Sequence, residues 1–152
     1  DGPGFRFSCF VQGCPHHCPG CHNPESHDPG GGRDMTVEAV AQELLKNPLT
    51  DGLTLSGGDP FAQPEDCLAL AKTAHEHGLN VWAYSGWTFE HLRDRGTPAQ
   101  RALLEEVDVL IDGPFLLEQR SLALPWRGSR NQRVIDARTS LKTGEAVIIP
   151  DA

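Results

Sequence analysis

Hydrophobic positions along the chain alternate between short apolar runs, typical of strands, and repeats of three and four residues, typical of helices. The runs predict strands over residues 5–11, 52–56, 80–84 and 107–111. The repeats predict helices from residue 36 to a stop at Pro48, and over residues 65–77, 89–95 and 99–106. This alternation favours right-handed βαβ units and an α/β fold with a mainly parallel sheet, either open or bent into a partial barrel.

The predicted strands end at segments rich in glycine, cysteine or serine. A cysteine-containing segment follows the first strand, Gly57-Gly58-Asp59 follows the second, and Ser85-Gly86 follows the third. In parallel sheets, ligands collect at the carboxyl ends of the strands. We therefore expect one binding site that is built from these three segments.

The regular alternation stops after Pro114, and the following part of the chain is basic. Residues 119–143 hold six of the thirteen Lys and Arg residues, opposed only by Asp136. The six are Arg120, Arg127, Arg130, Arg133, Arg138 and Lys142. Two interpretations stay open here, a solvated face and a docking surface for an acidic partner protein.

Length and charge narrow the class of protein. A chain of 152 residues with a net charge of -8 is expected to form a single domain over residues 1–152. It contains no apolar run of about 20 residues and no leader pattern, which favours a cytoplasmic protein without a membrane partner. The negative charge argues against nucleic acid as a partner. Because the sequence begins at Asp1 without a Met, we treat the N-terminus as truncated.

Five cysteines are unevenly distributed, which favours a metal or cluster site over a disulfide framework. Cys14, Cys18 and Cys21 lie within eight residues, separated by proline, glycine and histidine. Cys9 and Cys67 fall in a strand pattern and a helix pattern, where a small buried residue is the expected role.

The three clustered thiols allow two kinds of site. Zinc could take its fourth ligand from His16, His17 or His22. No second cysteine pair follows downstream, however, and this favours an iron–sulfur cluster with thiolate ligands. Three cysteines leave one iron of a four-iron cube without a protein ligand, which suggests that a small molecule coordinates and reacts there.

Six motifs in order give the chain a family likeness over nearly its whole length. They are Asp1-Gly-Pro-Gly-Phe-Arg6, the cysteine segment continuing as His22-Asn-Pro-Glu25, Ser56-Gly-Gly-Asp-Pro60, Tyr84-Ser-Gly86, Asp112-Gly-Pro-Phe115 and Gly128-Ser-Arg-Asn-Gln-Arg133. With these motifs the chain resembles the radical S-adenosylmethionine enzymes, and among them the glycyl-radical activating enzymes of the anaerobic ribonucleotide reductase branch.

The resemblance implies a cofactor set and its ligands. Cys14, Cys18 and Cys21 would hold a 4Fe-4S cluster whose fourth iron is chelated by S-adenosylmethionine. Backbone groups of Gly57 and Gly58 would lie beside the methionine part, because glycine permits close approach of the main chain.

The same resemblance assigns the remaining binding residues. The Asp59 carboxylate would pair with the ammonium group of S-adenosylmethionine. Gly20 and His22 would lie against the adenine, and Ser85 would reach the ribose hydroxyls. A turn or helix-cap role is the plain alternative for Ser85.

The implied activity is reductive cleavage of S-adenosylmethionine to a 5′-deoxyadenosyl radical, which then takes hydrogen from a glycine Cα of the large reductase subunit. The cofactors carry this chemistry, so no side chain is expected to be catalytic. The expected partners are the reductase and a reductant of the flavodoxin or ferredoxin type. Alternatives are an activase of another glycyl-radical enzyme, such as pyruvate formate-lyase, a zinc-binding interaction module and a ferredoxin-like carrier.

Overall fold

The computed structural model describes residues 6–11, 37–114, 116, 127, 129 and 131–149. Its elements in chain order are β1 (Arg6–Val11), α1 (Val37–Leu45), β2 (Gly52–Gly57), the short 3₁₀ helix η2 (Pro60–Ala62), α2 (Pro64–Glu76), β3 (Asn80–Tyr84), α3 (Phe89–Arg95), α4 (Pro98–Glu106), β4 (Val109–Asp112), β5 (Arg133–Asp136) and α5 (Ala137–Thr143). The predicted α/β class is confirmed.

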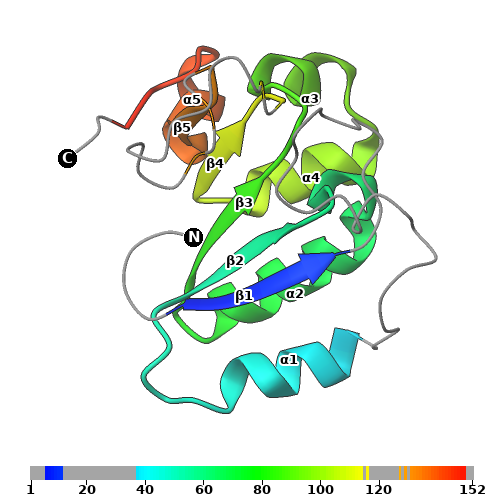
Figure 1. The fold of residues 1–152 in the computed structure, drawn as a ribbon, viewed down its shortest axis with the longest axis vertical. Coiled ribbons are helices and arrows are strands. Elements are labelled where there is room, and N and C mark those ends of the chain that lie inside the picture. The colour runs from blue at the N-terminus through cyan, green and yellow to red at the C-terminus, as the bar shows by residue number, and fades with distance from the viewer. Residues whose placement is uncertain are drawn as a thin grey trace.

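The strands form an open sheet in the order β1-β2-β3-β4-β5, which Figure 1 shows side by side. The first four strands are parallel, with Val11 opposite Gly57 and Ala83 opposite Leu110. β5 pairs with β4 in the antiparallel direction, placing Arg133 opposite Asp112. The mainly parallel sheet expected from the sequence is therefore present, and its carboxyl-terminal edge collects the ends of β1 to β4.

The main core lies between the sheet and the helices. Alternate strand residues such as Leu53, Val81 and Leu110 are fully buried against apolar side chains from all five α-helices. The opposite face of the sheet has a smaller cluster around Trp82, Ile111 and Val134. The period-2 alternation of each strand thus places one set of side chains on the helices and the other on the second face.

Helix ends follow the local sequence closely. α4 begins at Pro98, where the missing N–H costs nothing, and Thr97 and Gln100 form a reciprocal capping box. This moves the start one residue before the predicted Ala99. Val107 and Asp108 were expected to open the last parallel strand. Instead, Val107 is the buried C-terminal cap of α4, and β4 begins at Val109.

β5 and α5 were not predicted, because regular alternation was expected to stop after Pro114. β5 has four residues and only two central apolar positions, Val134 and Ile135, which is too short for a periodic signal. α5 has seven residues, with Asp136 as its N-terminal cap. Pairing with β4 and burial of Ile135 stabilise this segment through contacts that are distant in the sequence.

Among the described residues, the helices are too short or too polar for any of them to cross a bilayer.

Candidate functional site at the carboxyl edge of the sheet

The loop after β2 turns sharply at the predicted glycine pair. Gly57 has a φ of 95°, a left-handed conformation that glycine adopts without the penalty that a Cβ atom would bring. The turn redirects the chain into η2, which begins at Pro60. The backbone conformation thus favours glycine at position 57. The expected contact of Gly57 and Gly58 with the methionine part of a cofactor stays a prediction.

Asp59 connects two loops. Its side chain is fully buried, and its Oδ1 accepts a hydrogen bond from the Phe61 amide at 2.9 Å, which caps η2. Its Oδ2 accepts from the Ser85 hydroxyl at 3.0 Å and from the Gly86 amide at 2.9 Å. The carboxylate that was expected to face an ammonium group therefore accepts hydrogen bonds from at least three donors in the described part of its own chain.

Ser85 lies directly after β3 and is 5% exposed. Its hydroxyl donates to Asp59 and accepts from the Trp87 amide at 3.1 Å, and its own amide donates to the Ile111 carbonyl at 3.0 Å. The turn role considered for Ser85 is present. Because a hydroxyl oxygen has two lone pairs, Ser85 can still accept one more hydrogen bond.

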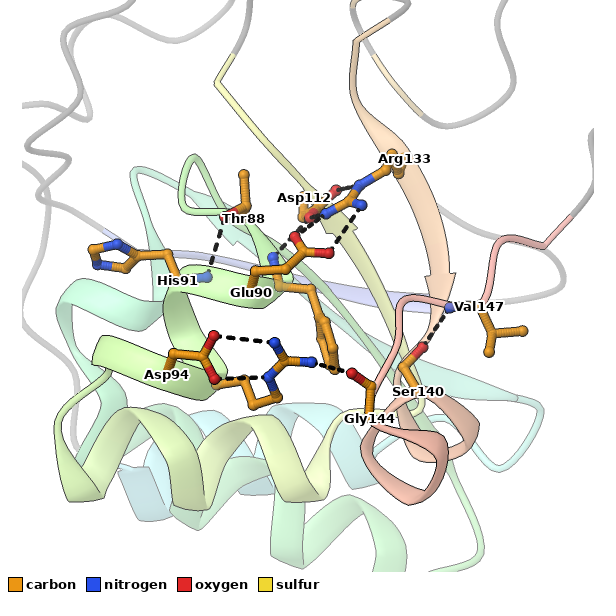
Figure 2. A network of polar contacts seen from close by, with 11 residues as sticks. Thr88, Glu90, His91, Asp94, Asp112, Arg133, Ser140, Gly144 and Val147 are labelled. Atoms are coloured by element: carbon orange, nitrogen blue, oxygen red, sulfur yellow. Dashed lines mark hydrogen bonds and ion pairs between the residues drawn. The ribbon is translucent and has the colours of Figure 1, made fainter.

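Asp112 ends β4 and is the second buried carboxylate at this edge, 1% exposed. Its Oδ2 accepts from the Phe89 amide at 2.7 Å, at the start of α3. Arg133 of β5 donates to both oxygens of Asp112, with an Nε–Oδ1 distance of 3.0 Å, and also to Glu90, as Figure 2 shows. The hydrogen bonds from Arg133 hold the pKa of Glu90 below its usual value, and Asp112 and Glu90 raise the pKa of Arg133.

Two sequence motifs that are far apart meet next to Asp112. The Gly113 carbonyl accepts from Gln132 at 3.0 Å, and the Pro114 carbonyl accepts from Asn131 at 2.7 Å. Ser129, which is fully buried, accepts from the Leu116 amide at 3.2 Å. The motifs that begin at Asp112 and end at Arg133 therefore form one hydrogen-bonded unit at the sheet edge.

The sequence showed these residues as two separate motifs and predicted no contact between them. The signal for Asp112 was an acidic residue that ends an apolar strand before Gly-Pro. Nothing local indicated that Arg133, 21 residues later, would be its partner.

The other predicted site residues lie outside the described residues. These are the metal ligands Cys14, Cys18 and Cys21 and the two cofactor-binding residues Gly20 and His22. In the part of the chain that is described, no group of three His, Cys, Asp or Glu residues could hold a metal ion.

The two isolated cysteines behave as the sequence indicated. Cys67 is buried in the main core and Cys9 is half-buried against it. Burial raises the pKa of both thiols, as expected for small residues packed in a core.

The described arginines of the basic stretch bond within the chain. Arg133 pairs with Asp112 and Glu90, Arg138 pairs with Asp108, and Arg127 donates to the Gln132 carbonyl at 3.0 Å. Lys142 is exposed, and Arg120 and Arg130 lie outside the described residues. Arg133 and Arg138 thus serve as internal ion pairs, a role that neither sequence-based interpretation included.

Comparison with known proteins identifies a family to which the sequence is similar. Residues 1–135 match the family model described as a 4Fe-4S single cluster domain. The chain is 35% identical over 144 residues to the anaerobic ribonucleoside-triphosphate reductase-activating protein of Salmonella typhimurium, covering 88% of this chain and 90% of that protein.

Two further relatives carry the same name. The protein of Haemophilus influenzae is 37% identical over 142 residues, covering 87% of this chain and 88% of the relative. That of Enterobacteria phage T4 is 33% identical over 141 residues, covering 88% and 85%. By the extent of these matches, the chain belongs to the family of anaerobic ribonucleoside-triphosphate reductase-activating proteins.

Proposed function

We propose that this chain is a radical S-adenosylmethionine activase that generates a glycyl radical on the large subunit of anaerobic ribonucleotide reductase. The observation that carries the proposal is the match to the reductase-activating family over 88% of the chain, together with a 4Fe-4S family model over residues 1–135. The three relatives reported above are all named as activating proteins of the anaerobic ribonucleoside-triphosphate reductase, which favours this reductase over another glycyl-radical enzyme as the partner.

The donor chemistry supports the cluster. Cys14, Cys18 and Cys21 would be its thiolate ligands, which suit iron–sulfur centres. β1 ends at Val11, opposite Gly57, and Cys14 follows Val11 by three residues in the sequence. The chain therefore enters the cysteine segment from the edge of the sheet where the Gly57 and Ser85 loops lie.

When bound, the cluster and S-adenosylmethionine supply a one-electron reduction that cleaves a carbon–sulfur bond, releasing methionine, and an oxidising equivalent that removes a hydrogen atom from a glycine Cα. The electron would come from a reductant of the flavodoxin or ferredoxin type. The protein contributes binding, orientation and exclusion of water.

The residues of this chain would orient the cofactor around the strand ends. The turn at Gly57 and Gly58 would admit the methionine end close to the backbone, and Ser85 would accept a hydrogen bond from the ribose. Gly20 and His22 would contact the adenine. The bonds within the chain that Asp59 makes favour an indirect role for that carboxylate.

A cysteine comparison tests the proposal. After anaerobic reconstitution with iron and sulfide, reduced wild-type protein should convert S-adenosylmethionine to 5′-deoxyadenosine, measured by liquid chromatography. Cys18→Ala should lack the cluster absorption and fall to background. Cys67→Ala is the matched control and should keep both, because Cys67 is a core residue.

The partner is tested by electron paramagnetic resonance. Mixing the loaded protein with the large reductase subunit should give a glycyl-radical doublet, and mixing with pyruvate formate-lyase should not. A colourless protein that holds one zinc ion and forms no 5′-deoxyadenosine would contradict the enzyme and support the interaction module. A brown protein that transfers electrons without cleaving the cofactor would support the carrier.

A further inference from the structure

The loop between β3 and α3, residues 85–88, lies between two buried carboxylates. Asp59 approaches from the loop after β2, and Asp112 approaches from the end of β4. Both side chains are almost completely inaccessible to solvent, at 0% and 1% exposure. Because β3 is between β2 and β4 in the sheet, the loop is held from both neighbouring strands.

Each carboxylate accepts hydrogen bonds from one end of the loop. Asp59 Oδ2 accepts from the Ser85 hydroxyl and the Gly86 amide at the loop start. Asp112 Oδ2 accepts from the Phe89 amide just after its end. Such bonds from N–H and O–H groups to ionised carboxylates are about twice as strong as bonds between neutral groups.

The second oxygen of each carboxylate, Oδ1, accepts a hydrogen bond from a residue outside the loop. Asp59 Oδ1 accepts from the Phe61 amide, and Asp112 Oδ1 accepts from Arg133. A direct ion pair between Asp59 and a ligand would require the buried carboxylate to become accessible. The geometry therefore favours an action of Asp59 through the loop.

We propose that Asp59 is a positioning residue that holds Ser85 and Gly86 in a preformed platform for the nucleoside end of S-adenosylmethionine, with Asp112 fixing the far end of the loop. This rests on the proposed function for the identity of the ligand. The ordering of the loop is a property of the chain before the cofactor binds, so it can be measured separately.

The first measurement is hydrogen exchange of the Gly86 and Phe89 amides in cluster-loaded wild-type protein, without S-adenosylmethionine. Both amides should exchange slowly, because their hydrogen bonds are already formed. If these amides exchange fast and become slow only after S-adenosylmethionine is added, the platform is not preformed and the inference is overturned.

The second measurement compares Asp59→Asn with Asp136→Asn. Asn has the same shape but lacks the second anionic oxygen. Asp136 is the matched control because it also caps a helix, accepting from the Thr139 amide at 3.1 Å. β5 is antiparallel to β4, so Asp136 lies at the opposite edge of the sheet from the proposed platform.

For Asp59→Asn we expect loss of Gly86 protection and about a tenfold rise in the dissociation constant of S-adenosylmethionine, the size of one lost hydrogen bond to a charged group. The cleavage rate at saturating S-adenosylmethionine should stay within about twofold of wild type, because the platform affects binding and not the reaction itself. Asp136→Asn should leave both Gly86 protection and affinity unchanged.

The outcomes separate this role from its alternatives. Weaker binding with Gly86 still protected would indicate direct contact between Asp59 and the ligand, and would overturn the inference. Unchanged affinity after loss of protection would also overturn it. If wild-type protein shows no affinity for S-adenosylmethionine, the proposed function itself fails. Slow exchange of the Gly86 and Phe89 amides would then still show an ordered loop, but S-adenosylmethionine would not be its ligand.

Discussion

His75, near the end of α2, has a carboxylate at each ring nitrogen. Nδ1 lies 3.0 Å from Glu106 Oε1, and Nε2 lies 2.9 Å from Asp108 Oδ2. Burial lowers the pKa of His75 and the nearby Arg138 also lowers it, but the hydrogen bonds to Asp108 and Glu106 outweigh both, so the pKa is raised above 6.5. With a proton on each nitrogen, the ring can donate to both carboxylates at once.

This residue predicts a pH dependence of stability. Because the folded pKa of His75 exceeds its unfolded value, its contribution is fully present below about pH 6.5 and is lost as the pH rises through the folded pKa. The free energy of unfolding of wild type should therefore fall more between pH 6 and pH 8 than that of His75→Gln, measured by urea denaturation. His77→Gln, whose ring contacts the Thr73 carbonyl, should behave as wild type. Parallel pH profiles for wild type and His75→Gln would contradict the assignment.

At the scale of elements, one arginine connects β5, β4 and α3. Arg133 donates to Asp112 at the end of β4 and to Glu90 in the first turn of α3, and Figure 2 shows its guanidinium between the two carboxylates. The Glu90 side chain is 45% exposed, whereas that of Asp112 is 1% exposed. Solvent therefore screens the Arg133–Glu90 contact more than the Arg133–Asp112 contact.

Arg133→Met should destabilise the protein by about 1–3 kcal/mol, because it leaves the buried Asp112 carboxylate without its cation. The free energy of unfolding from urea titration measures this. Lys46→Met removes a solvent-exposed ion pair with Glu43 and should cause no measurable loss. Equal stability of the two variants would show that Arg133 is only a surface charge.

Across the whole molecule, Arg6 attaches the edge strand β1 to the sheet. Its guanidinium donates to the Leu53 carbonyl and the Thr54 hydroxyl of β2, each at 2.8 Å, and to Asn80 of β3 at 2.6 Å. It also lies 5.4 Å from the centre of the Trp82 ring. Arg6 therefore spans three strands on the face of the sheet opposite the main core, at the strand that leads toward the cysteine segment.

Removing this guanidinium should loosen β1 selectively. In Arg6→Met we expect amide hydrogen exchange in β1 to accelerate roughly tenfold, because several hydrogen bonds between strands are lost, while β3 and β4 amides retain their protection. Arg93→Met is the control, since Arg93 pairs with its neighbour Asp94 within α3. Uniform acceleration across all strands would mean that Arg6 supports global stability instead.

The accuracy with which the sequence predicted the strands differs from one strand to the next. β2 and β3 were predicted within one residue, because each is a short segment of strand-favouring residues with glycines close to both ends. β5 was missed, because its two apolar residues carry no period, and its antiparallel direction depends on pairing with β4. Local periodicity records which face of a segment is apolar, whereas the pairing of strands depends on packing between distant segments.

The site divides in the same way. The sequence alone determined that the Gly57 and Ser85 segments follow parallel strands, and parallel strands must bring their carboxyl ends to one edge. Only the tertiary structure decided that Asp59 accepts from Ser85 and Gly86, and that Asp112 meets Arg133. Each of these bonds joins residues at least 21 positions apart, and a buried carboxylate takes whichever donors the folded backbone brings within about 3 Å.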